Sequence, residues 1–327
     1  MIPAKNRRVR SLLILCLLML GLSFAASAQT ATLVGTVTDP SGSVVPNVTI
    51  TATHVETGQV RTTKASDAGQ YVFADLPIGH YNVKAEASGF GVAQQNSVVL
   101  NVADRARIDF ALKLGAATET ITVEADAVRV QSENGEVSSV ITGQQITQLA
   151  TNGRSMYSLA NLTPGASSGQ ADFQIPTPVG GDAAMSFNGQ RMSHNLYMLD
   201  GAESSDRGGG GGSDVMPSLD SIAEFRMLTS NYSAEYGLSS AATMTAVIRS
   251  GQKQFHASAW EFLRNDALDA NNYFVPKQDL RFHTYGFNVG GQAPFWKSHP
   301  TFFFYNMEWR SLIQNGTTNQ TVPVASA

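Results

Sequence analysis

The sequence predicts a mainly β protein built of three consecutive parts. Residues 31–114 are short β runs separated by turn residues such as DPSG, DAGQ and SGF, a spacing typical of a small antiparallel β-sandwich. Residues 137–251 mix short helical stretches with strands, which indicates an α+β domain. Residues 252–327 carry three strands that alternate apolar and polar side chains. A chain of 327 residues, 43% of them hydrophobic, is long enough for these domains.

The first 28 residues predict a secretory signal peptide. Basic residues precede the apolar run LLILCLLMLGLSF at 12–24, and Ala26-Ser27-Ala28 gives the small-residue pattern of a cleavage site. The apolar run is shorter than the roughly 20 residues that a membrane-spanning helix needs. We therefore expect an exported protein that is cut after Ala28.

Charge and cysteine content narrow the possible functions. The signal peptide holds four basic and no acidic residues, so its removal changes the net charge from −4 to −4 − 4 = −8. A net acidic exported protein is a poor candidate for binding nucleic acid. The single cysteine, Cys16, lies in the apolar run. The mature protein is therefore expected to have no disulfide, no cysteine metal site and no cysteine nucleophile.

The sandwich region shows both a strand pattern and a resemblance. Val48, Ile50 and Ala52 alternate with threonines, as expected for a strand with one buried face. GTVTDPSGSVVPNVTITA and the following GQYVFADLPIGHYNVKAEASGF resemble the carboxypeptidase regulatory-like domain. The resemblance implies a transthyretin-like, carbohydrate-binding-like β-sandwich over residues 29–114.

The sequence offers no candidate catalytic residue, cofactor or metal site. A zinc peptidase needs His and Glu ligands at close spacing, and the six histidines are scattered. His54 and Glu56 would share one face of a strand, but two ligands do not make a site, and we interpret the pair as ordinary strand surface. The glycines of SDRGGGGGSD (205–214) follow no apolar strand, so we interpret them as a flexible loop and not a phosphate site. Because the HExxH motif and a paired acid/base constellation are also missing, we predict that the chain is not an enzyme.

Residues 115–136 have the composition of a linker with one short apolar island at Ile121, Thr122 and Val123. An extended apolar segment in a solvated linker can add itself as a strand to the sheet edge of a partner. The alternative, which the sequence leaves open, is that the island forms the last strand of the sandwich or is plain linker.

Between residues 137 and 251 the pattern predicts short helices and strands. A Thr cap precedes GQQITQL, and a second helical stretch leads up to Pro164. MSFNGQR and NLYMLDGA are predicted strands that end in the turn pairs Asn-Gly and Asp-Gly. SLDSIAEFRML predicts a short helix running into a strand, and AATMTAVIRSG predicts a strand closed by Gly251.

HASAWEFLR, HTYGFNVGG and TFFFYNMEWR predict three successive antiparallel strands, each close to the roughly 9–11 residues that a membrane barrel strand requires. One face of the last two is apolar and aromatic, whereas the other carries Gly, Asn and Glu, which suit a wet lumen. The residues predicted to face lipid are Tyr285, Phe287, Phe303, Tyr305, Met307 and Trp309.

The run from PSLDSIAEFRML to DANNYF (217–274) resembles the plug-to-barrel junction of TonB-dependent outer-membrane receptors. NGRSMYSLANLTPG, FNGQR and YMLDG are similar to earlier plug segments of the Oar-like group of this family, and ETITVEA resembles its TonB-box region. The resemblance implies a plug domain at 137–251, the first strands of an antiparallel transmembrane β-barrel at 252–327, and a location in the cell outer membrane. The partners it implies are a periplasmic TonB-type energy-transducing protein, outer-membrane lipid, and a carbohydrate or peptide substrate.

Two further expectations concern the barrel. If the plug begins in the periplasm, the first strand runs outward, so residues 265–281 form an extracellular loop and residues 292–300 a periplasmic turn. Three strands cannot close a barrel, so we expect a truncated receptor that does not transport alone. The alternative function is a secreted carbohydrate- or surface-binding β-sandwich protein without a membrane barrel.

Overall fold

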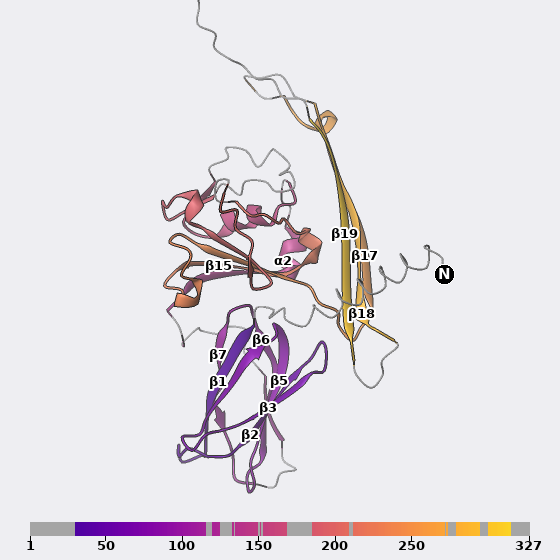
Figure 1. Cartoon of the computed structure of the whole chain (residues 1–327). Coiled ribbons are helices and arrows are strands. Elements are labelled where there is room, and N and C mark those ends of the chain that lie inside the picture. Colours follow the sequence, from indigo (N-terminus) through magenta and orange to yellow (C-terminus); the bar gives the residue numbers. More distant parts are fainter. Residues whose placement is uncertain are drawn as a thin grey trace, which may run out of the picture.

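The computed structural model describes residues 30–115, 120–124, 133, 135–149, 151, 153–168, 185–208, 212–271, 273, 279–294 and 300–314. The predicted signal peptide lies outside this part of the chain. Three bodies of secondary structure follow one another: a β-sandwich, a mixed middle domain and a three-stranded sheet (Figure 1). Within the described residues, no helix combines the length and the apolar character needed to cross a membrane.

The sandwich packs two sheets around one core. One sheet has the order β4-β1-β7, with β8 also pairing with β1, and the other has the order β3-β2-β5-β6-β9. The strands are β1 (Ala31–Thr38), β2 (Thr49–His54), β3 (Val60–Lys64), β4 (Gln70–Leu76), β5 (Gly79–Glu86), β6 (Val92–Leu100), β7 (Arg105–Arg107), β8 (Phe110–Ala111) and β9 (Thr120–Glu124). The predicted alternation is confirmed in β2, where Ile50 and Ala52 are buried and Thr49, Thr51 and Thr53 are half-buried.

The strand pattern predicted an antiparallel sandwich, but the structure also contains parallel pairs. β7 and β8 pair with β1 in parallel, and β9 pairs with β6 in parallel. Parallel neighbours need a crossover, because the chain must return to the same end of the sheet before the next strand begins. Hydrophobic periodicity does not show such a crossover. The second sheet therefore extends to Glu124, beyond the predicted boundary at residue 114.

The middle domain is built on a five-stranded sheet of order β10-β15-β16-β13-β14, beside a two-stranded sheet of β11 and β12. Its strands are β10 (Val137–Thr142), β11 (Ala166–Ser168), β12 (Met185–Phe187), β13 (Leu196–Leu199), β14 (Ala202–Glu203), β15 (Ile222–Ser230) and β16 (Thr243–Ile248). Its helices are α2 (Gly143–Gln148) and the short 3-10 turns η2 (Met156–Leu162), η3 (Met192–His194), η4 (Leu219–Ser221) and η5 (Ala234–Tyr236). The predicted cap is confirmed, since Thr142 forms a capping box with Gln145 at the start of α2.

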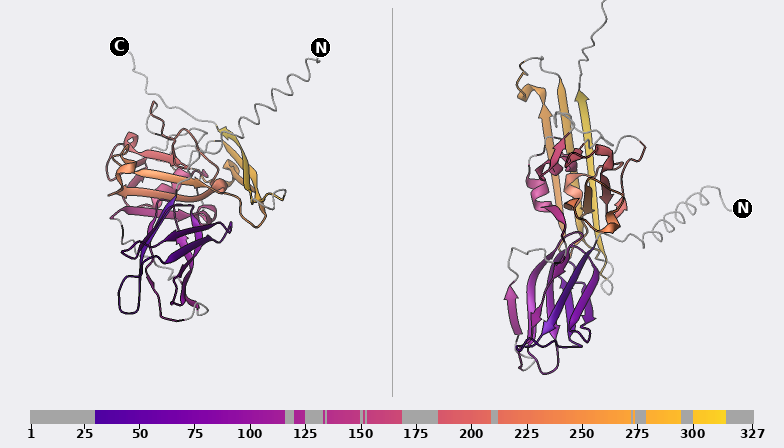
Figure 2. Two further views of the ribbon diagram at one scale, coloured as in Figure 1. Left: turned by 60° about the horizontal axis from the view of Figure 1, so that its bottom comes forward. Right: turned by 90° about the vertical axis from the view of Figure 1, so that its left-hand side faces the viewer.

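The last part forms three antiparallel strands in sequence order, as predicted. They are β17 (His256–Asn265), followed by η6 (Asp266–Leu268), then β18 (Leu280–Gln292) and β19 (Phe302–Gln314). Figures 1 and 2 show this long sheet standing along one flank of the middle domain, while the sandwich lies at the end of the middle domain.

Candidate functional site

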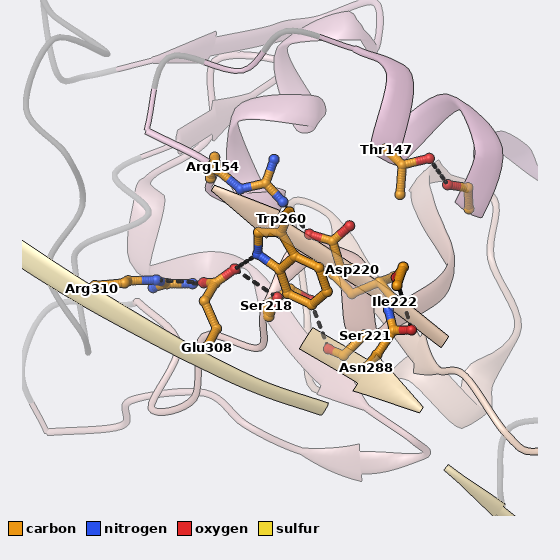
Figure 3. Close-up of polar contacts among 12 residues, drawn as sticks. Thr147, Arg154, Ser218, Asp220, Ser221, Ile222, Trp260, Asn288, Glu308 and Arg310 are labelled. Carbon is orange, nitrogen blue, oxygen red and sulfur yellow. Dashed lines mark hydrogen bonds and ion pairs between the residues drawn. The ribbon is translucent and has the colours of Figure 1, made fainter. Parts of the chain in front are cut away.

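The candidate functional site is the contact between the middle domain and the three-stranded sheet, centred on Glu308 (Figure 3). The Glu308 side chain, on β19, is only 5% exposed. Its Oε2 atom accepts hydrogen bonds from the Ser218 hydroxyl at 2.9 Å and from the Trp260 indole N–H at 3.2 Å. Its Oε1 atom accepts a hydrogen bond from Nε of Arg310 at 2.8 Å. One buried carboxylate therefore joins the middle domain to two strands of the sheet.

The register of the sheet brings these groups together. Trp260, Gly286 and Glu308 lie opposite one another across β17, β18 and β19, so their side chains share one face. A Cβ atom on Gly286 would lie 2.8 Å from the Trp260 ring, closer than side chains approach. Glycine on the middle strand therefore lets the indole reach across the sheet to the carboxylate.

Arg154 makes a second contact with the same face. Its guanidinium forms an ion pair with Asp220 of the middle domain and lies 3.7 Å from the ring centre of Phe262 on β17. Burial raises the pKa of Asp220, although the Arg154 charge pulls it down, and burial also lowers the pKa of Arg154. The cost of burying both charges thus opposes their attraction, and the ion pair serves to orient the guanidinium over the ring.

The chain passes from β16 to the sheet through a tightly packed glycine. A Cβ atom on Gly251 would lie 2.3 Å from the Phe303 carbonyl oxygen and 2.8 Å from that of Gly291. Just before it, Arg249 donates from Nε to the Ile222 carbonyl at 3.0 Å, which ties this segment back to β15. Gly251, predicted only as the end of a strand, is therefore a point where the chain packs directly against the backbones of β18 and β19.

The six residues predicted to face lipid lie on the face of the sheet opposite Glu308. Their exposed fractions range from 37% for Phe303 to 50% for Tyr305. Tyr285 stacks on Trp309 at 5.6 Å between ring centres. On the other face, Thr284 and Asn288 are buried. The predicted division of the sheet into an apolar exposed face and a polar covered face is present, and contact with lipid remains a prediction.

Ile121, Thr122 and Val123 lie in β9, at the edge of the second sandwich sheet. Their backbones pair in parallel with residues 93–95 of β6. The structure thus has the arrangement that the sequence left open as an alternative, a last strand of the sandwich. Pairing with a partner protein remains a prediction for these residues.

The interpretation of His54 and Glu56 as a pair on the strand surface is wrong. His54 is only 6% exposed, and its ring nitrogens lie 3.1 Å from the Ile78 carbonyl oxygen and 2.9 Å from the Thr57 hydroxyl. The alternation that buries Ile50 and Ala52 also carries His54 inward, whereas Glu56 lies beyond the end of β2. Among the described residues, no group of three or more His, Cys, Asp or Glu side chains could hold a metal ion.

The residues that surround Glu308 could not be identified from the sequence. Ser218, Trp260 and Arg154 come from three distant segments, and only the register and the packing of the sheet bring them together. The one available signal was a carboxylate on the polar face of an aromatic strand, which indicated a wet environment without identifying the groups it binds.

Comparison with protein families divides the chain into the same three bodies. Residues 32–113 match the carboxypeptidase regulatory-like domain, residues 130–244 match the TonB-dependent receptor plug domain, and residues 247–327 match an outer membrane beta barrel domain. The three matches therefore correspond, in chain order, to the sandwich, the middle domain and the three-stranded sheet.

The chain is 27% identical over 250 residues to the TonB-dependent transporter Oar of Myxococcus xanthus, a match that covers 72% of this chain and 22% of that relative. The chain thus spans about a fifth of the length of the relative. Two solved structures are similar to parts of it. They are the siderophore receptor PirA from Acinetobacter baumannii (19% identity, TM-score 0.36, covering 52% of this chain and 24% of that one) and the outer membrane transporter YddB from Escherichia coli (11% identity, TM-score 0.39, covering 53% and 26%).

Proposed function

We propose that this chain, with its regulatory-like sandwich, plug and barrel strands in that order, works as part of a TonB-dependent outer-membrane receptor that transports a substrate. The observation that carries the proposal is the two-sided character of the three-stranded sheet. On one face Glu308, which also accepts the Trp260 indole N–H, binds Ser218 of the plug, while the other face exposes a continuous set of large apolar side chains. Soluble proteins seldom leave such a face open to water, whereas the wall of a membrane barrel requires it.

Charged groups border the aromatic side chains toward the η6 end of this face. Glu261 lies opposite Tyr285 in the register, and its carboxylate lies 3.7 Å from the Nδ1 atom of His283, one row beyond the stacked pair Tyr285 and Trp309. Aromatic rings followed by charged groups are typical of the edge of a bilayer. In this orientation η6 and the loop after it lie outside the cell, and the turn between β18 and β19 lies in the periplasm.

The contact at Glu308 consists of hydrogen bonds, which supports the proposal. A plug has to shift before a substrate can pass, and a contact made of hydrogen bonds can be replaced by water as the plug moves. Ser218 is the plug residue that binds this carboxylate, whereas Trp260 belongs to β17, so movement of the plug segment that carries Ser218 frees the plug from Glu308. No covalent step is required of any residue.

The partner that supplies energy would be a periplasmic TonB-type protein that pairs with Ile121–Val123. β9 is an edge strand, and an edge strand can accept a further strand from a partner. Thr122→Pro removes an N–H from this strand and is expected to abolish crosslinking to the partner. Thr62→Pro, in the opposite edge strand β3, is the matched control; equal crosslinking in both variants would exclude β9 as the contact.

Labelling of single cysteines on intact cells tests the location. Cys16 is the only cysteine of the chain and belongs to the predicted signal peptide, so an introduced cysteine is unique in the mature protein. Leu268→Cys, in exposed η6, should react with a membrane-impermeant maleimide, whereas Val60→Cys in the sandwich should react only after the outer membrane is permeabilised. Equal labelling of both, with the protein in the soluble fraction, would favour a secreted binding protein instead.

A further inference from the structure

A buried arginine joins the plug to the sandwich. Arg226 lies in β15 and its side chain is 0% exposed. Its guanidinium donates to the Val102 carbonyl and, at 2.8 Å, to the Asp104 carboxylate, both in the turn between β6 and β7. It also donates to Glu136 at 3.2 Å and to the Ser138 hydroxyl at 3.1 Å, just before and within β10. A single side chain thus connects two plug segments with the sandwich.

Glu224 holds the same turn from the same strand. Its carboxylate accepts a hydrogen bond from the Val102 N–H at 2.9 Å, and Glu224 is only 6% exposed. The alternation of β15 places Phe225 and Met227 in the plug core and puts Glu224 and Arg226 on the other face. That second face would meet water in an isolated plug, and here the sandwich turn contributes to covering it.

The turn is shaped before it meets the plug. Asp104 accepts hydrogen bonds from the backbone N–H and the side-chain amide of Asn101, at 3.0 and 2.9 Å, and Ala103 has a positive φ of 57°. The Asp104 carbonyl also accepts a hydrogen bond from Thr32 in β1 at 2.7 Å. A preformed turn loses little further freedom on docking, so its contacts contribute more to the association.

A second contact fixes the orientation of the sandwich. The backbone N–H of Lys253, in the segment between β16 and β17, donates to the Glu56 carbonyl in the turn after β2 at 2.9 Å. Figure 1 shows β6 and β7 ending beneath β15. One point of contact would allow the sandwich to pivot on the plug, whereas two contacts from different turns prevent it.

We propose that the turn at 101–104 locks the sandwich onto the plug, so that the two move as one rigid body and displacement of the sandwich reaches β15 directly. β15 pairs with β16, and β16 leads through Gly251 into the barrel strands, so the displacement is passed on to the junction with the barrel. A force that displaces the sandwich would then displace the plug as well, which a sandwich joined only by a flexible linker could not do. The lock depends on contacts within the chain and holds whether or not the receptor function is correct.

Distances between spin labels on the intact chain test this lock. Cysteines are introduced at exposed Val60 in the sandwich and exposed Leu238 in the plug, and the distance distribution is measured by pulsed electron paramagnetic resonance in detergent. The parent is expected to show one narrow distribution, and Arg226→Met a broad one. Arg249→Met is the matched control, because that arginine binds the carbonyls of Ile222 and Gly143 within the plug, and it should keep the narrow distribution.

Three outcomes would overturn the proposal. A broad distribution in the parent would mean that the two domains are only tethered. A narrow distribution in Arg226→Met would mean that other contacts seat the sandwich. Equal broadening in Arg226→Met and Arg249→Met would mean that loss of plug folding, and not loss of the lock, is being observed. None of these depends on membrane location, which the cysteine labelling tests separately.

Discussion

Glu308 shows how a single residue holds two bodies together. Its carboxylate is almost completely buried, yet both oxygens are occupied by donors from the plug, from β17 and from β19 itself. A buried charge is tolerated only when such partners are present, and these donors in turn need the Glu308 carboxylate as their acceptor.

Replacing Glu308 by Ala should therefore destabilise the contact by about 3 kcal/mol, because it leaves the Trp260 N–H and the Arg310 guanidinium without their acceptor. Urea unfolding followed by tryptophan fluorescence measures the change. Glu86→Ala removes an exposed carboxylate that forms an ion pair with Lys84 on the sandwich surface, and should cost less than about 1 kcal/mol. Similar losses in the two variants would contradict the role given to Glu308.

Glu224 makes a prediction about pH. Burial is the main cause that raises the pKa of its carboxyl to about 7, and Asp104 adds to the rise, whereas the Val102 N–H and Arg226 oppose it. Glu136 is a further carboxyl bound to Arg226, its pKa is also raised by burial, and Glu235 faces it. The folded protein therefore holds the Glu224 proton more tightly than the unfolded chain does. The free energy of unfolding should fall as pH rises through about 7.

For Glu224 this loss is on the order of 3 kcal/mol between pH 4 and pH 8. Glu224→Gln does not titrate and keeps an oxygen for the Val102 N–H, so its stability should depend less on pH than that of the parent. Glu136 would retain part of the dependence. Urea midpoints at the two pH values measure the slopes, and the same slope in the parent and in Glu224→Gln would show that the carboxyl does not titrate as described.

At the scale of elements, the three-stranded sheet depends on a small residue in its middle strand. Gly286 stands between Trp260 and Glu308 in the register, and its lack of a side chain leaves room for the indole. A glycine inside a strand is otherwise unfavourable, so its presence here is explained by the close approach of a neighbouring side chain.

Gly286→Ala should lower stability by about 1–3 kcal/mol, because the new methyl group would force the Trp260 ring or the backbone of β19 to move. Gly135→Ala is the matched control, since a Cβ atom there meets nothing within 4 Å and no positive φ is involved. Thermal melts of both variants give the comparison. Equal melting temperatures would mean that the indole does not occupy this space.

At the scale of the whole molecule, the order of the three domains could be predicted because a region with short helices stands between two regions of alternating strands, and because each region resembles a known family. Alternation in β2 and in β18 and the Thr142 cap are local patterns, and the structure confirms them. The buried position of His54 was available from the same alternation, although the general preference of histidine for the surface argued against it.

The contacts between domains could not be predicted. Arg226 meets Asp104 across 122 positions of sequence, and Ser218 meets Glu308 across 90. Nothing in a short window shows which polar residue on a strand will be covered by another domain. For β9 the sequence left a sandwich strand, a plain linker and a partner-binding segment open, because its parallel pairing with β6 follows a crossover that a short window does not show.

The most direct test of the receptor proposal asks what the exposed face of the three-stranded sheet meets. Met307 and Val72 are both exposed apolar residues on strands, at 39% and 54%, one on that face and one on the sandwich. In protein folded into lipid vesicles, Met307→Arg should cost about 2–4 kcal/mol if it lies near the middle of the bilayer. Val72→Arg should change the free energy of unfolding by no more than about 0.5 kcal/mol, since Val72 faces water. Denaturant titrations measure both. A small cost at both positions, or a fold that forms without lipid, would contradict the assignment of this sheet to a membrane barrel.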